Sequence, residues 1–116
     1  MGVSKVNRPP AAELSASAIL LLERRYQALK EQLLQLGWIA QGSVNPQPPH
    51  AWRLTRKIKA KTVSLALTAE QASLYKEAIA NHRNLENILG EMRAISEEML
   101  QKSVPGVQKR PRQKHP

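Results

Sequence analysis

The first part of the chain carries apolar residues at alternating three- and four-residue spacings. From Ser15 onward the positions are Ile19, Leu22, Tyr26, Leu29, Leu33 and Leu36. Such positions lie along one face of an α-helix, and a heptad stripe of this kind is typical of helices that pack as coiled coils. Gly37 follows the last of them and suits the residue just beyond a helix C-terminus. The pattern predicts a helix over residues 14–36.

A longer stripe of the same kind occupies the C-terminal half. Thr68 and Gln71 have the spacing of a capping box, in which each side chain bonds the backbone N–H of the other residue. The stripe then runs through Tyr75, Ala78, His82, Leu85, Leu89, Met92 and Met99. Because Val104-Pro105-Gly106 cannot continue a helix, we predict a long helix from Thr68 to about Leu100.

Between the helices the period changes to two, which is typical of β-strands. A two-residue turn at Lys59-Ala60 would pair residues 52–58 with 61–67 as a hairpin. One face is then mostly apolar, with the facing pairs Trp52 and Leu67, Leu54 and Leu65, Arg56 and Val63, Ile58 and Lys61. The other face is polar and basic, with Arg53, Thr55, Lys57, Thr62, Ser64 and Ala66. The turn lacks the Gly or Asn that such turns favour.

The segment before the hairpin divides into two parts. Residues 38–44 tolerate a strand, whereas Asn45 to His50 contains three prolines without backbone donors and is predicted to be a loop outside any sheet. The expected fold is therefore α+β: two antiparallel coiled-coil-like helices joined by a small two- or three-stranded antiparallel sheet. This single domain spans residues 13–103, preceded by a flexible lead over 1–12 and followed by a disordered basic tail over 104–116.

The net charge of +9 is concentrated at the hairpin and the tail. Cations mixed with hydroxyl donors suit phosphate oxygens, so we expect binding to DNA or structured RNA. The candidate nucleic-acid-binding residues are Arg53, Thr55, Arg56, Lys57, Lys59, Lys61, Thr62 and Ser64 in the hairpin, and Lys109, Arg110 and Arg112 in the tail. Two plainer interpretations remain open: lysines that protect an edge strand from unwanted pairing, and a tail that only aids solubility.

Arg56 differs from the other candidates because it is in phase with Trp52 and Leu54 on the apolar face. A structural role, stacked on Trp52 or Trp38 or paired with Glu70, is favoured over direct contact with nucleic acid.

The two predicted helices differ in length. If they fold back as a hairpin, the first helix covers the second only as far as about Met92. Ile95, Met99 and Leu100 would then form an exposed apolar strip that needs a second copy or a larger partner protein. An adaptor that docks through its helices is therefore the alternative function.

Little in the sequence supports chemistry. There is no Cys and no Asp, the three His residues are isolated, and the nine Glu occupy solvent-type helical positions. We expect no catalytic residues, no metal, no cofactor and no small-molecule substrate. The longest apolar run, Ala18 to Leu22, is too short to span a membrane, so a cytoplasmic protein without a membrane partner is expected.

Three stretches together carry a resemblance to a known family: Thr55 to Ser64, Leu67 to Gln71, and Ala78 to Leu85. Over about residues 25–100 the chain resembles a small uncharacterised bacterial family often encoded beside transposase genes. Its members look like a helix, a basic hairpin with a Gly-Lys-Thr tip and a long C-terminal helix, often with a Cys-rich segment before the hairpin.

The chain departs from this family at two places. Ala60 stands where the family usually has Gly, and residues 42–50 contain no Cys. The resemblance implies a mobile-element context and a nucleic-acid or protein partner, and it implies no reaction. The expected function is therefore an accessory subunit of a mobile-element-associated nucleoprotein complex.

Overall fold

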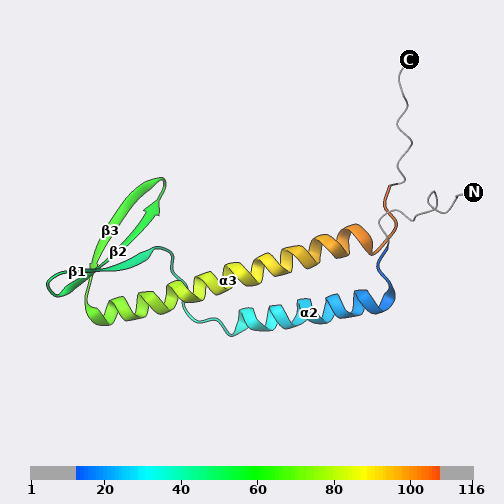
Figure 1. The fold of residues 1–116 in the computed structure, drawn as a ribbon, viewed down its shortest axis with the longest axis horizontal. Helices are drawn as coiled ribbons and strands as arrows, with labels where there is room; N and C mark the ends of the chain where they lie inside the picture. Colours follow the sequence, from blue (N-terminus) through cyan, green and yellow to red (C-terminus); the bar gives the residue numbers. More distant parts are fainter. Residues whose placement is uncertain (1–12, 108–116) are drawn as a thin grey trace, which may run out of the picture.

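A computed structural model describes residues 13–107 and shows two helices and a three-stranded antiparallel sheet (Figure 1). The elements in chain order are α2 (Ala16–Leu34), β1 (Ser43–Gln47), β2 (Ala51–Ile58), β3 (Lys61–Leu67) and α3 (Ala69–Lys102). The α+β fold class is confirmed. The expectations for residues 1–12, and for the tail from 108 onward with Lys109, Arg110 and Arg112, lie outside the described residues.

The two helices run antiparallel, and each begins at a side-chain cap. The Ser15 hydroxyl accepts a hydrogen bond from the Ala18 amide at the start of α2. Thr68 and Gln71 form the predicted capping box at the start of α3. The Leu14 amide donates to the Lys102 carbonyl oxygen at 3.0 Å, so the start of α2 lies beside the end of α3.

The predicted apolar stripes meet in a core between the two helices, which we call the helix core. Its buried residues are Leu29, Ile88 and Ile95. Partly buried side chains pack around them: Leu22, Tyr26, Leu33, Leu36, Met92 and Met99. The helix core therefore extends to the C-terminal end of α3.

The expectation that α3 outruns α2 at its C-terminal end is wrong. Ile95 is only 8% exposed, because α2 packs on the C-terminal half of α3. The linker after α2 is the physical reason, since it continues along α3 toward the N-terminal end of that helix before the sheet begins. The Asn81 side-chain amide donates to the Trp38 carbonyl at 2.9 Å, and the Ala40 amide donates to the Ala78 carbonyl at 3.1 Å. It is the N-terminal half of α3 that α2 leaves uncovered.

The sheet packs on that N-terminal half, in the order β1-β2-β3. The register between β2 and β3 is the predicted one, from Trp52 opposite Leu67 to Ile58 opposite Lys61. The predicted two-residue turn is also confirmed, with positive φ at both Lys59 (51°) and Ala60 (66°). These values match a type I′ turn, whose twist suits a two-residue hairpin.

The prediction of a loop from Asn45 to His50 is wrong for its first three residues. Asn45, Pro46 and Gln47 belong to β1, where they pair with Arg53, Trp52 and Ala51 of β2. An edge strand needs hydrogen bonds on one side only, so a proline without an N–H can occupy it. The sheet therefore has three strands along the part that contacts α3.

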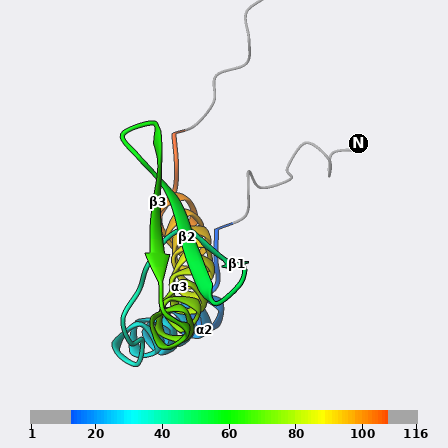
Figure 2. The same cartoon turned by 90° about the vertical axis from the view of Figure 1, so that its left-hand side faces the viewer.

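A second, smaller core lies between the sheet and α3, and we call it the sheet core. Leu54, Leu67 and Ala72 are buried there, beside Val44, Trp52, Tyr75 and Ile79. Within the described residues α2 contacts α3, and the strands contact α3, but α2 does not contact the strands. Figure 2, which looks along α3, shows the hairpin rising on the side of α3 opposite to α2.

Candidate nucleic-acid interface

The register of the sheet assigns every strand residue to one of two faces, because residues opposite each other in antiparallel strands point the same way. One face packs on α3 through Leu54 and Leu67. The other, which we call the polar face, points away from α3. It consists of Ser43, Asn45 and Gln47 of β1, Ala51, Arg53, Thr55 and Lys57 of β2, and Thr62, Ser64 and Ala66 of β3.

The predicted residues Arg53, Thr55, Lys57, Thr62 and Ser64 therefore do share one face. Sequence reasoning missed the contribution of β1, which adds one hydroxyl and two carboxamide side chains. The alternation of Val44 and Pro46 with polar residues was the available signal, and it was outweighed by the density of prolines.

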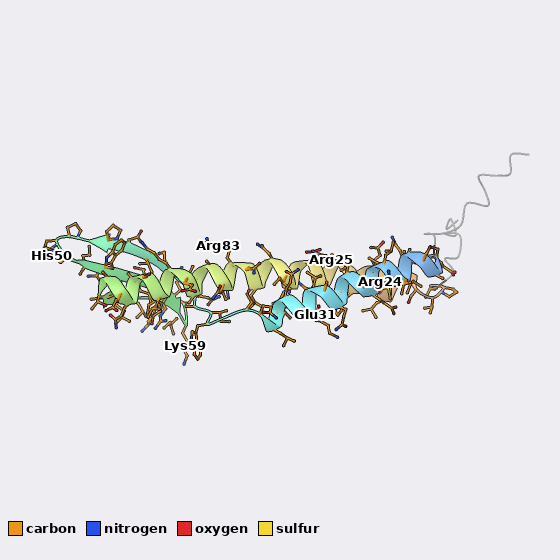
Figure 3. The ribbon with its side chains drawn as sticks, turned by 90° about the horizontal axis from the view of Figure 1, so that it is seen from below. Arg24, Arg25, Glu31, His50, Lys59 and Arg83 are labelled. Carbon is orange, nitrogen blue, oxygen red and sulfur yellow. The ribbon has the colours of Figure 1, made fainter. Side chains whose placement is uncertain are left out.

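Positive charge on the hairpin is unopposed by nearby acidic residues in sequence, since none occurs between Glu31 and Glu70. Lys57, Lys59 and Lys61 are exposed along the outer half of the hairpin. Lys59 lies at the turn, at the opposite end of the sheet from His50 (Figure 3). Such a surface attracts anions, because cations that lie close together create a local positive potential.

Arg53 is held in place by its neighbour on the edge strand. Its Nε donates to the Gln47 Oε1 at 2.7 Å, and the pair is partly buried. No hydrogen bond or ion pair from residues 13–107 engages its two terminal nitrogens. Those nitrogens are nevertheless not buried, because the described part of the chain contains no buried side-chain nitrogen or oxygen without a partner. Arg53 therefore presents two oriented donors on the polar face.

The outer half of the hairpin is a free two-stranded ribbon. Pairing with β1 stops at Thr55, so β2 and β3 continue alone toward the turn. Ile58 and Val63, on the face directed toward α3, are exposed in this part of the hairpin because it extends past the helix. The ribbon is thus accessible from both faces.

Arg56 lies on the face directed toward α3, as predicted, and is partly buried. The cation over the Trp52 ring is Lys76 of α3, with its Nζ at 4.1 Å from the ring centroid, rather than Arg56. Trp38 lies far out in solvent, with 90% of its surface exposed. Among the described residues Arg56 therefore does not stack on Trp52 or Trp38 as predicted.

The three residues predicted as a partner interface have different environments. Ile95 is in the helix core, Met99 packs against it, and Leu100 is 76% exposed. They line one open hollow of about 400 Å³ together with Leu22 and Tyr26. They do not form the continuous exposed strip expected from the helix lengths.

Other exposed apolar side chains lie around the linker between α2 and β1. They are Leu34, Trp38, Ile39 and Leu74, and the last three line a hollow of about 370 Å³ on α3. No sequence pattern indicates this cluster, because Leu74 meets the linker only through the path that the linker takes along α3.

Other chemistry is sparse in the part of the chain that the structure describes. His82 is partly buried, with its Nε2 at 3.3 Å from the Gln41 amide nitrogen and 3.7 Å from Glu86 Oε2. No group of three potential metal ligands occurs among residues 13–107, and no helix in that range is long and apolar enough to cross a membrane.

Comparison of the chain with protein-family models, with curated proteins and with solved structures finds no match.

Proposed function

We propose that this protein binds nucleic acid through its β-hairpin, as an accessory subunit of a mobile-element-associated nucleoprotein complex. The observation that carries the proposal is a projecting ribbon whose cations have no acidic neighbour along the chain. Arg53 and Lys57 lie on the polar face, and Lys59 and Lys61 lie at the tip. The mobile-element context rests on the family resemblance of the hairpin and the flanking helices.

Phosphate binding accounts for the combination of residue types on this surface. Lysine and arginine neutralise phosphate charge and release condensed counterions, which supplies much of the affinity of such complexes. Hydroxyl groups donate short hydrogen bonds to phosphate oxygens, and Thr55, Thr62 and Ser64 provide them between the cations. Edge protection alone would not require this mixture over a complete face.

The test is the salt dependence of binding. Replacing Lys57, Lys59 and Lys61 with Gln removes three phosphate contacts, and replacing Arg53 removes a fourth cation, so the slope of log affinity against log salt should fall by about 3 units. Fluorescence anisotropy with labelled duplex and single-stranded probes measures the slope. Circular dichroism should show unchanged helicity, since these side chains lie outside both cores.

A matched control removes the same charge from the helices. Arg24, Lys30, Arg83 and Arg93 are all exposed, and Figure 3 shows Arg24 on α2 far from the hairpin turn and Arg83 on α3 on the opposite side of the view from Lys59. Changing these four residues to Gln should leave most of the salt slope intact. Equal losses in the two variants would show that only net charge matters and would overturn the proposed site.

A second candidate function is a protein adaptor, favoured by the exposed apolar residues Trp38, Ile39 and Leu74, which line one hollow on α3. Exposed clusters of large apolar side chains often mark protein interfaces. Changing Trp38 and Leu74 to Ser should abolish assembly with a protein partner while leaving nucleic-acid affinity unchanged. The hairpin variant should have the opposite effects.

A further inference from the structure

We propose that the nucleic acid is duplex DNA, that the polar face of the sheet enters its major groove, and that Arg53, positioned by Gln47, reads a base edge there. This inference rests on the proposed function and narrows it to one ligand and one mode of recognition. It is carried by the composition of the polar face, by its dimensions and by the hydrogen bond that orients Arg53.

The polar face contains the side chains that read base edges, in addition to those that bind phosphate. Arginine can bond both acceptors of guanine, Asn or Gln can bond adenine, Ser and Thr can bond either, and a methyl group can contact thymine. The face supplies all of these types, with Arg53, Asn45, Thr55, Ser64 and Ala66. A surface built only to hold phosphates would need cations and would not need carboxamides.

The dimensions of the sheet suit the groove of B-form DNA. Neighbouring strand axes lie about 4.8 Å apart, and the outer part of the hairpin is a two-stranded ribbon, the form of sheet that the major groove admits. The major groove of B-DNA is about 12 Å wide, whereas that of an RNA duplex is too narrow for side chains to read. Short residues at Ser43, Thr55, Thr62 and Ser64 allow the backbone to approach the bases closely.

The Arg53–Gln47 hydrogen bond separates this arginine from the other cations of the hairpin. With Nε bound to Gln47, the two terminal nitrogens form the end of the guanidinium fork that is free to bond guanine O6 and N7. Arg25 on α2 has a different arrangement, because its Nε and one terminal nitrogen are both bound by Glu91. Ordering Arg53 in advance reduces the side-chain entropy lost on binding.

The lysines complete the arrangement from the outer half of the ribbon. Lys57, Lys59 and Lys61 lie beyond the last paired residue of β1 and are exposed. As flexible point charges they suit the phosphates that border the groove, which position a protein without reading its sequence.

The experiment uses the full chain and two measurements. Selection from a pool of random-sequence DNA duplexes, followed by sequencing, reports base preference. Affinities for a DNA duplex, an RNA duplex of the same sequence and the single DNA strand, at one near-physiological salt concentration, report the ligand class. We expect an enriched motif that contains a guanine, and at least about tenfold tighter binding to DNA duplex than to RNA duplex.

Variants that preserve charge isolate the reading step. Arg53→Lys keeps the charge but loses the fork, so preference at one base position should fall about tenfold or more while the salt slope stays constant. Gln47→Leu should reduce the same preference by a smaller factor. The matched control is Arg56→Lys, which makes the same change on the opposite face and should leave the motif unaltered. Melting temperatures of all three variants establish that each is folded.

The possible results distinguish base reading in the major groove from nucleic-acid binding in general. Salt-dependent binding with equal affinity for the three probes and no enriched motif would overturn groove reading and leave nucleic-acid binding in place. An enriched motif that survives both Arg53→Lys and Gln47→Leu would overturn the role of Arg53. An absence of binding to every probe would overturn the proposed function as well.

Discussion

The two ends of α3 carry cores of different kinds, and their surfaces differ even more. At the C-terminal end the helix core is built from aliphatic heptad positions, and charges of both signs cover its surface, as in the Arg25–Glu91 pair. At the N-terminal end the sheet core is smaller, and its strands carry cations without a single acid. Unopposed like charges disfavour a compact state. The contrast supports the proposal that the hairpin binds a ligand, whereas the helix pair has the balanced surface charge of a structural element.

The largest expected effect comes from removing one fully buried leucine from each core. Leu29→Ala and Leu54→Ala should each lower the free energy of unfolding by about 2–5 kcal/mol, through lost burial and the cavity left behind. Because α2 makes no contact with the strands among residues 13–107 and each packs on α3, Leu54→Ala should release the sheet while amides around Ile88 stay protected. Leu29→Ala should loosen α2 and spare the hairpin.

Urea unfolding followed by circular dichroism measures the first quantity, and hydrogen exchange followed by NMR measures the second. Equal loss of protection at both ends in both variants would show a single cooperative unit and remove the distinction between the two cores.

Replacing one glycine at each end with alanine should change the free energy of unfolding by a smaller amount, and with opposite signs. Gly42, at the entry to β1, has φ of +128°, and a Cβ there would lie 2.8 Å from the Thr55 carbonyl oxygen. Gly42→Ala should therefore destabilise the sheet by about 1–3 kcal/mol. Gly90 lies within α3, where a Cβ would meet no side chain or neighbouring element within 4 Å. Gly90→Ala should stabilise the helix by about 0.5–1 kcal/mol.

Thermal melting of both variants provides the comparison. A rise in melting temperature for Gly42→Ala would mean that β1 is free to move away from β2 at no cost, against the register given above.

The smallest effect concerns the exposed ion pair. The hydrogen bond from Arg25 lowers the pKa of Glu91, and the same bond raises the pKa of Arg25. A lowered carboxyl pKa in the folded state stabilises the protein above the ordinary carboxyl range, and this contribution is lost as the pH falls through the lowered value. Glu91→Gln should slightly reduce the melting temperature at neutral pH and leave it unchanged in acid. A difference that grows as the pH falls would contradict this account.

The parts of the fold that sequence predicted have local, periodic signals. The hairpin register follows from the alternation of residues 52–67, and the start of α3 follows from the Thr68 and Gln71 pair. The turn was predicted although Ala60 adopts a positive φ, in the position where the resembled family has glycine. In that turn the strand pairing outweighs the local preference of alanine.

The parts that sequence missed depend on contacts between distant residues. The position of α2 on α3 follows from hydrogen bonds of Asn81 and Ala78 to the linker, which has no period of its own. The proline-containing strand β1 forms only because it pairs with β2. The Arg53–Gln47 bond depends in turn on β1, so the three β1 residues of the polar face could not be placed without the structure.

Because α3 is one continuous helix, it fixes the distance and the relative rotation between the two ends of the molecule. Its 34 residues span about 51 Å at 1.5 Å per residue, from the sheet to the exposed Leu100 end. A helix also sets a rotation, since each added residue turns the far end by about 100°. A protein bound at the Leu100 end would therefore stand at a set distance and a set rotation from whatever the hairpin holds. Insertions in α3 would change the geometry of such an assembly without altering either contact surface.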